Sequence, residues 1–432
     1  MTSGESGPQP AGSTSMLDRL KIMLAVARSA MDPRRWLIGG LAALMVAAGG
    51  VVLDNWSGVE QPAEWPWNIE LGTLDGDRKV ESLLSAAGAQ PVATAVRVAW
   101  NPRLVGRPLQ DVMTPAVRIV ASRESWSETA VNWSRFLLAV IAWSLAGVIL
   151  VRMTAADVVR GESVTLAQAV GFGFRQSGSL LAAALISLSC FGALWGLAVL
   201  GGLFAKIPSV GPLVVSLLWF IPLMLGLLMT IVALGFVAGW PLMVATIGVE
   251  DSDGFDGFTH AHGFLTDRPF LLASHAAIAT IVASVAACLG WLALSLTIWF
   301  AGSAVGVGLN AFDAKRDLEV VSNSLSETSL VGGGEVPARL VTAESGEPAD
   351  IPFSSTFLVF WIRVSHVLFV GYVASVFWGV VTGLYLVVRD SADGIPMSQM
   401  WLESDDTQPE SPVGGAALES AETDSGSSDE SD

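Results

Sequence analysis

The feature that most constrains this chain is a run of 43 residues without a charged side chain, between Lys206 and Glu250. A straight helix needs about 20 apolar residues to cross the roughly 30 Å hydrocarbon core of a bilayer. The run is too long for one crossing and too short for two crossings with a comfortable turn. It therefore predicts one span, at residues 212–236, and then a bend at Gly239-Trp240-Pro241, because proline removes a backbone donor.

Five further apolar runs make the chain an all-α polytopic transmembrane bundle of about six spans. The chain is 52% hydrophobic and only 15% charged, whereas about a quarter of the residues of a soluble protein are charged. The excess apolar side chains must face lipid or each other. The other five spans are predicted at residues 36–53, 136–151, 180–204, 270–293 and, after a helical lead within 353–388, 367–388.

The segments outside the spans differ in composition, and each predicts a different structure. A charged lead of 35 residues before the first span is long for a signal peptide, which favours a retained span over cleavage. The segments are a disordered N-terminus (1–15), an amphipathic interfacial helix (16–35), an extracytoplasmic cap (54–135) with an amphipathic helix at 109–120, a mobile acidic, Ser- and Gly-rich loop (310–352) with a short strand at 336–341, and an acidic disordered C-terminal tail (389–432).

The distribution of Lys and Arg predicts the orientation of the bundle. If both termini lie on the inner side, ten Lys and Arg residues lie on that side, in the N-terminal lead, in the short loops and at Arg389. Only four lie in the two shorter loops on the outer side. Short cytoplasmic loops carry the excess of positive charge. We therefore expect both termini to be cytoplasmic, although the long cap would place eight bases outside.

Two short amphipathic helices, which we call elbows, each follow one span and precede the next. Thr165 and Gln168 have the spacing of a capping box before the first elbow, and Asp253 can cap the second. The units span, elbow, span align at an offset of 89 to 91 residues, which predicts a four-span unit at residues 136–309 with a parallel internal repeat; the alternative is chance similarity of apolar segments. The aligned positions are Glu162-Ser163 with Asp251-Ser252, Phe174 with Phe264, and Leu180-Leu181 with Leu271-Leu272.

Several short motifs resemble an uncharacterised family of bacterial multi-spanning integral membrane proteins. These motifs are Gly239-Trp240-Pro241-Leu242-Met243, Glu250-Asp251-Ser252-Asp253-Gly254-Phe255-Asp256, Arg268-Pro269, and Phe377-Trp378 followed by Tyr385-Leu386-Val387-Val388-Arg389. The resemblance implies the bacterial cytoplasmic (inner) membrane and brings no established activity. The chain departs from the pattern at His260-Ala261-His262, where such families have Arg and aromatic residues.

The acidic run Asp251, Asp253 and Asp256 contains oxygen ligands of the kind that calcium prefers. An EF-hand loop that starts at Asp251 needs glycine at position 256 and glutamate at position 262. The chain has Asp256 and His262 there. The spacing therefore favours helix capping over a calcium site.

Two histidines and two cysteines remain as candidate metal ligands. His260 and His262 with nearby carboxylates could hold a transition metal, but positions two apart on a helix diverge by about 200°. Cys190 and Cys288 each lie inside an apolar run and are too few for a Cys-rich centre. We expect no metal and no cofactor.

His275, Arg363 and His366 are the ionisable residues nearest the lipid zone. Because charge is costly there, they could line a proton or solute path. Alternatively, their side chains can reach the headgroups. Gly192 and Gly196 form a GxxxG pair that allows close approach of helices, and we expect it to pack within this chain.

No catalytic motif is present, which points to a non-catalytic membrane protein, a structural or interaction component or a complex subunit. Its expected partners are the lipid bilayer and other membrane proteins that contact the cap, the elbows or the acidic tail. Nucleic acid is not expected, since the chain without the tail has 28 acidic and 23 basic residues. The alternative is a small-solute or lipid transporter built on the repeat, and an enzyme would need polar residues gathered by the fold.

Overall fold

The computed structural model describes residues 16–58, 65–67, 70–71, 81–82, 98, 101–121, 126–208, 210–311 and 353–393. These residues are almost entirely helical, with one antiparallel pair of two-residue strands. The elements are α1 (Met16–Ser29), α2 (Pro33–Ser57), β1 (Glu70–Leu71), β2 (Glu81–Ser82), α5 (Pro102–Val105), α6 (Arg107–Ala121), α7 (Trp126–Ala155), the π-helical turn η1 (Ala156–Arg160), α8 (Leu166–Arg175), α9 (Ser177–Phe204), α10 (Gly211–Leu217), α11 (Phe220–Glu250), α12 (Gly254–Asp267), α13 (Pro269–Ala311) and α15 (Phe353–Asp393).

Six of the described helices are long and apolar enough to cross a membrane: α2, α7 with η1, α9, α11, α13 and α15. The prediction of an all-α polytopic bundle with six spans is therefore confirmed, and the protein is a multi-pass membrane protein. The predicted N-terminus (1–15), the strand at 336–341 and the tail beyond residue 393 lie outside the described residues.

Several helices extend beyond the spans expected from hydropathy. The fourth span begins at Phe220 and not at residue 212, because α10 takes up the preceding apolar residues. The helix continues through Pro241 to Glu250 without the predicted interruption. In the same way, α13 continues to Ala311 and α15 is one helix from Phe353.

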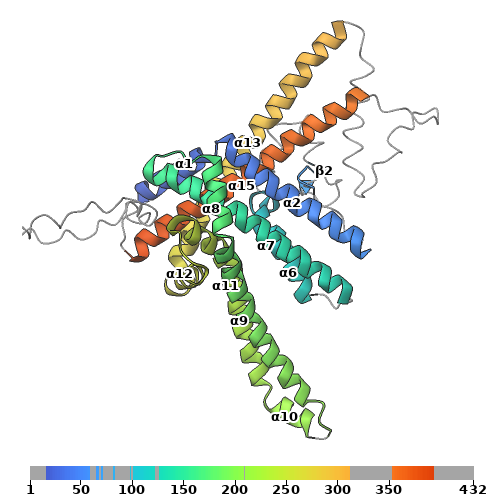
Figure 1. Cartoon of the computed structure of the whole chain (residues 1–432), viewed down its shortest axis with the longest axis vertical. Helices are drawn as coiled ribbons and strands as arrows, with labels where there is room; N and C mark the ends of the chain where they lie inside the picture. Colours follow the sequence, from blue (N-terminus) through green and yellow to red (C-terminus); the bar gives the residue numbers. More distant parts are fainter. Residues whose placement is uncertain are drawn as a thin grey trace, which may run out of the picture.

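Three groups of helices diverge from the region that holds the elbows α8 and α12 (Figure 1). The α9–α11 hairpin runs to α10 at its tip, α2 runs with α6 and α7, and α13 runs with the first half of α15. The two central spans are α7 and α15, in which 72% and 83% of the most apolar window is buried inside the protein. The core of the bundle is thus built by α7, α15 and the helix ends that meet them.

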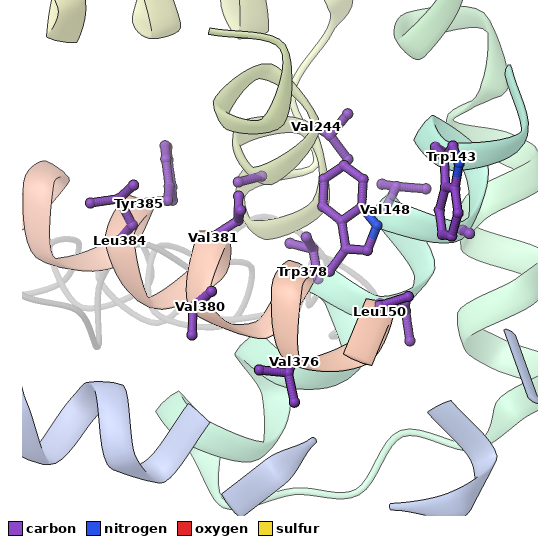
Figure 2. Close-up of a cluster of buried hydrophobic side chains, with 14 of the residues drawn as sticks. Trp143, Val148, Leu150, Val244, Val376, Trp378, Val380, Val381, Leu384 and Tyr385 are labelled. Carbon is purple, nitrogen blue, oxygen red and sulfur yellow. The ribbon is translucent and has the colours of Figure 1, made fainter. Parts of the chain in front are cut away.

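The core is filled by large aromatic side chains that interlock between three helices. Trp378 of α15 lies between Val148 of α7 and Val244 of α11 (Figure 2), and its ring meets that of Trp240 edge to face at 5.6 Å. Gly147 makes room for it, since a Cβ there would lie 2.6 Å from Trp378 Cζ2. This interior is packed with side chains at the level of the tryptophans.

Glycines also bring α2 and α15 into close contact. A Cβ on Gly371 would lie 1.9 Å from the carbonyl oxygen of Trp36, and one on Gly39 would lie 2.7 Å from the carbonyl oxygen of Gly371. Such small residues allow the backbones of membrane helices to approach. On its other side, α15 is fixed to α13 by the Tyr372 hydroxyl, which donates to the carbonyl of Ala286 at 2.9 Å.

Helix α11 divides into two halves with different surroundings. Every residue from Gly239 to Val249 is buried, whereas large side chains from Phe220 to Leu234 are exposed. The segment that begins at the predicted bend is thus the part of α11 in the protein core. The segment assigned to the span itself faces the surroundings, which in a bilayer is lipid.

Helix α1 packs on the bundle with one face and exposes another apolar face. Among its described side chains, the buried apolar ones are Met23 and Val26, which lie against Gly379 and Gly383 of α15. Leu24, on another face of the helix, is 55% exposed. An interfacial helix next to a bundle therefore needs two apolar faces, one for protein and one for lipid.

Candidate functional site

The two elbow helices begin with the caps that the sequence predicts. Thr165 Oγ1 accepts from the backbone N–H of Gln168 at 3.4 Å, and Gln168 Oε1 accepts from the backbone N–H of Thr165 at 3.1 Å. Asp253 accepts from the backbone N–H groups of Phe255 and Asp256, each at 2.9 Å. The Asp253 carboxylate is thereby used to start α12, as the capping interpretation expects.

The first elbow is held to the turn before the second elbow through Asp251. This residue has a left-handed backbone with φ 55°, and its carboxylate accepts from Arg175 Nη2 at 2.8 Å and also from Gln176 Nε2. Because Arg175 ends α8 and Asp251 ends α11, both elbows lie on the same face of the bundle. We call this face the elbow face.

The adjacent carboxylate, Glu250, is held by two side chains of α15. It accepts a hydrogen bond from the Tyr385 hydroxyl and forms an ion pair with Arg389, whose Nε lies 3.0 Å away. Only 17% of the Glu250 side chain and 13% of the Arg389 side chain are exposed. A pair with so little solvent depends on both partners, because either charge alone would be costly there.

His260 of the second elbow joins the same network. Its Nδ1 lies 3.0 Å from Arg389 Nη1. Arginine has only donors, so Nδ1 must accept and the ring proton must reside on Nε2. The elbow helix α12 is thereby connected through Arg389 to Glu250 at the end of α11.

Two further arginines pack around the first elbow. The guanidinium groups of Arg152 and Arg175 lie 4.4 Å and 5.2 Å from the ring of Phe172, which is buried. Arg152 also donates to the carbonyl of Val249 at 3.4 Å. We call the whole network the elbow junction, and its members are Arg152, Phe172, Arg175, Gln176, Glu250, Asp251, His260, Tyr385 and Arg389.

The motifs behind the family resemblance meet at or next to this junction. Trp240 packs on Trp378, Glu250 binds Tyr385 and Arg389, and Arg268 donates to the carbonyl of Ser391 at 2.6 Å. The sequence did not indicate these pairings. The available signal was that Glu250 and Arg389 are the first charged residues after long apolar segments.

The histidines considered as metal ligands are separated by the fold. His260 contacts Arg389, whereas His262 Nδ1 lies 3.0 Å from its own helix carbonyl at Phe258, with the two rings 4.1 Å apart. Within the described ranges, no three His, Cys, Asp or Glu side chains are grouped so that they could hold a metal ion. The second elbow therefore places its two histidines in different surroundings.

The three residues considered for a proton or solute path are not gathered at one place. His275 and His366 are buried, and each Nδ1 contacts a carbonyl one turn earlier in its own helix, at 2.8 Å and 2.7 Å. His366 lies beside Trp291, which is 16 residues from His275 along α13, or roughly 24 Å at 1.5 Å per residue. The Arg363 guanidinium lies 5.2 Å from the Trp67 ring.

The prediction that the GxxxG pair packs within this chain is wrong for the described residues. A Cβ added to Gly192 or Gly196 would meet nothing within 4 Å. Helix α9 pairs with α11 in a hairpin that diverges from the core (Figure 1), and the added Cβ atoms would lie away from other parts of the protein. Nearby, Cys190 is also exposed, whereas Cys288 is half-buried.

The burial pattern gives a different register for the repeat from the one read in the sequence. Phe172 and Phe264 are both buried, whereas Phe174, which the sequence aligned with Phe264, is 63% exposed. Buried residues correspond at a spacing of 92: Ala169 with Ala261, Phe172 with Phe264, and Leu180 with Leu272.

Compared with models of protein families, with curated proteins and with solved structures, the chain gives no match.

Proposed function

We propose that this protein is a non-catalytic structural or interaction component of a bacterial cytoplasmic membrane, with the elbow junction as the rigid base that holds its two elbow helices. The observation that carries the proposal is the pair of adjacent carboxylates at the end of α11. Glu250 and Asp251 are each held by two side chains from other elements. Carboxylates that are held by side chains of other helices fix those helices relative to one another.

The surroundings of the other ionisable groups support the same proposal. Arg35 donates to the carbonyl of Ser29 at 2.6 Å and of Met153 at 3.1 Å, and it pairs with Asp157 at 3.2 Å. This joins the turn between α1 and α2 to the end of α7. Catalysis requires a reactive group whose partners converge on a substrate position, whereas these partners hold helix ends together.

The elbows present apolar side chains that an interaction component could use. Phe174 in the first elbow is 63% exposed and Phe255 in the second is 61% exposed. Each lies on a helix that is fixed to the core on its other side, through Phe172 and through His260. In our proposal these two positions contact membrane proteins or the bilayer surface.

A photocrosslinking experiment in native membranes tests this proposal. Benzoylphenylalanine at position 255 is expected to give a protein adduct of one defined mass, and the same group at the buried position 264 is expected to give none. The adduct at position 255 should weaken in the Glu250→Ala background, because Arg389, which contacts His260 of α12, then loses its ion-pair partner. Lipid adducts alone at position 255 would count against an interaction role for the elbow.

The alternative is a lipid or small-solute transporter, and one observation favours it. The buried positions that recur at a spacing of 92 residues support a repeat, and parallel repeats are common in transporters. A scrambling assay with a fluorescent phospholipid in proteoliposomes addresses this possibility. Empty liposomes give the fraction of the fluorescent phospholipid that is bleached in the outer leaflet alone. A larger bleached fraction in the proteoliposomes would favour transport over the structural role.

A further inference from the structure

Helix α6 lies beside α7 and runs in the opposite direction (Figure 1). The end of α6 at Ala121 and the start of α7 at Trp126 are close in the sequence. Farther along both helices, Asp111 of α6 accepts a hydrogen bond from Trp143 Nε1 at 2.9 Å. This contact joins residues 32 positions apart, so α6 follows α7 into the bundle from the end at which α7 begins.

The contact with Trp143 gives the depth that α6 reaches in the membrane. The apolar part of α7 is bounded by Arg135 and Arg152, and Trp143 lies 8 residues from the first and 9 from the second. These separations correspond to roughly 12 Å and 14 Å along a helix. Together they approach the roughly 30 Å of a hydrocarbon core. Asp111 therefore lies near the mid-depth of the bilayer.

A basic residue pairs with Asp111 at this depth. Arg107 lies one turn earlier in α6, with its Nε 3.5 Å from the carboxylate, and only 6% and 9% of the two side chains are exposed. Still earlier in the chain, the short helix α5 contacts α13 and α15. The beginning of α6 and the whole of α5 are thus surrounded by spans.

The chain enters and leaves the membrane on one side around α5 and α6. Asp54, in the last turn of α2, pairs with Arg135 near the start of α7, so α2 ends on the side on which α7 begins. Between these two spans, α5 and the beginning of α6 lie deep in the bundle. The helix expected at residues 109–120 of the cap is therefore part of a re-entrant segment, a structure that membranes accept where protein or water surrounds it.

A cavity of about 100 Å³ lies between α2, α6 and α7 and follows the polar stripe of α6. Its volume is several times the roughly 15 Å³ that one water requires on this measure. It extends from the level of the Asp54–Arg135 pair to that of the Arg107–Asp111 pair. We call this space the polar cavity. Its charged and hydroxyl side chains are Asp54, Arg107, Asp111, Thr114, Arg118 and Arg135.

Helix α6 has a polar face towards the cavity and an apolar face elsewhere. Its four residues in the cavity lining follow each other at intervals of four, three and four positions, which places them on one face of a helix. Val117 and Val120 lie on a different face and are 61% and 75% exposed. Within the lining, Thr114 is exposed, so the cavity is open to the surroundings of the protein there.

Water is the occupant that fits this lining. Cavities that stay dry are apolar, whereas a polar cavity of sufficient size holds water. Charged residues within a membrane face the protein interior or a water-filled space, because charge is costly in hydrocarbon. We propose that the polar cavity is a water-filled vestibule that leads from the membrane surface to the Arg107–Asp111 ion pair near mid-depth. It opens on the side opposite the elbow face and does not depend on the elbow junction.

Cysteine labelling of the full-length protein in sealed membrane vesicles tests this proposal. Single cysteines are introduced after the two native cysteines have been replaced, and a charged, membrane-impermeant methanethiosulfonate is added on the side on which α7 begins. The test variants are Thr114→Cys and Gly50→Cys, which both line the cavity. A Cβ at Gly50 would meet nothing within 4 Å. The matched controls on the same two helices are Val117→Cys and Val52→Cys, at positions that are 61% and 65% exposed.

The two test cysteines should react at least about tenfold faster than their controls, because the reactive thiolate is suppressed in hydrocarbon. Both controls lie nearer the membrane surface than their test positions, so depth alone would favour the controls. The proposal is overturned if the test cysteines react no faster than the controls, or if they react only from the elbow face. Gly50→Cys decides the question if Thr114→Cys does not fold.

A second measurement tests the re-entrant position of α6. Bimane attached to Val117→Cys should be quenched by bromine atoms carried on lipid acyl chains, since this position is six residues, or roughly 9 Å, from Asp111 along the helix. Bimane attached to Thr114→Cys should instead be quenched by iodide in the water. Absence of quenching by the brominated chains at position 117 would place α6 outside the hydrocarbon core and overturn the proposal.

Discussion

Replacing Tyr385 with phenylalanine removes one hydroxyl from the elbow junction and keeps the ring, which packs edge to face on Phe264 at 6.1 Å. The hydroxyl donates to Glu250, and a hydrogen bond to a charged group contributes about 1.5–3 kcal/mol. Glu250 keeps its ion pair with Arg389, so its charge is not left alone. We therefore expect a loss near the lower limit, about 1.5 kcal/mol in the free energy of unfolding.

A double-mutant cycle with Glu250→Gln separates this contact from other effects of the substitution. The coupling energy between Tyr385 and Glu250 should be about 1 kcal/mol, above the roughly 0.6 kcal/mol typical of polar pairs between membrane helices. The reason is that the acceptor is charged and the donor is fully buried. The free energy is measured by reversible unfolding in mixed micelles. If the two single-substitution effects sum to the effect of the double substitution within about 0.3 kcal/mol, this account of the junction is refuted.

Two further predictions concern packing and topology. Gly147→Ala should destabilise the bundle by about 1–3 kcal/mol, because the new methyl group would lie 2.6 Å from the Trp378 ring; Gly192→Ala, in open space, is the control and should change stability by less than about 0.5 kcal/mol. Equal effects of the two substitutions would contradict the packing. Cysteines placed at Ser163 and Ser322 in a cysteine-free background should be labelled from opposite sides of the membrane, and labelling of both from one side would refute the proposed topology.

The number of spans and the elbows could be predicted because both leave local signals in the sequence. A span requires a long uncharged run, and an elbow begins with a polar cap such as Thr165 or Asp253, whose hydrogen bonds involve residues two or three positions away. These signals depend only on neighbouring residues. They do not depend on which helices later pack together.

The surroundings of each helix could not be predicted in this way. Lipid and protein core are equally apolar, so hydropathy does not distinguish the buried segment 239–249 of α11 from its exposed segment 220–234. The pairing of Glu250 with Tyr385 joins residues 135 positions apart. The ion pair between Arg135 and Asp54 likewise joins residues 81 positions apart. Contacts of this kind arise only from the packing of the helices.

The central position of α15 has a consequence for the synthesis of the protein. This helix follows all the other described spans in the chain and is the most buried of them. The space between α7 and α11 that Trp378 fills therefore stays open while the earlier spans enter the membrane. By contrast, α9 and α11 expose most of their length and can pair as soon as both are inserted. The hairpin can thus assemble during translation, whereas the core is completed only when α15 arrives.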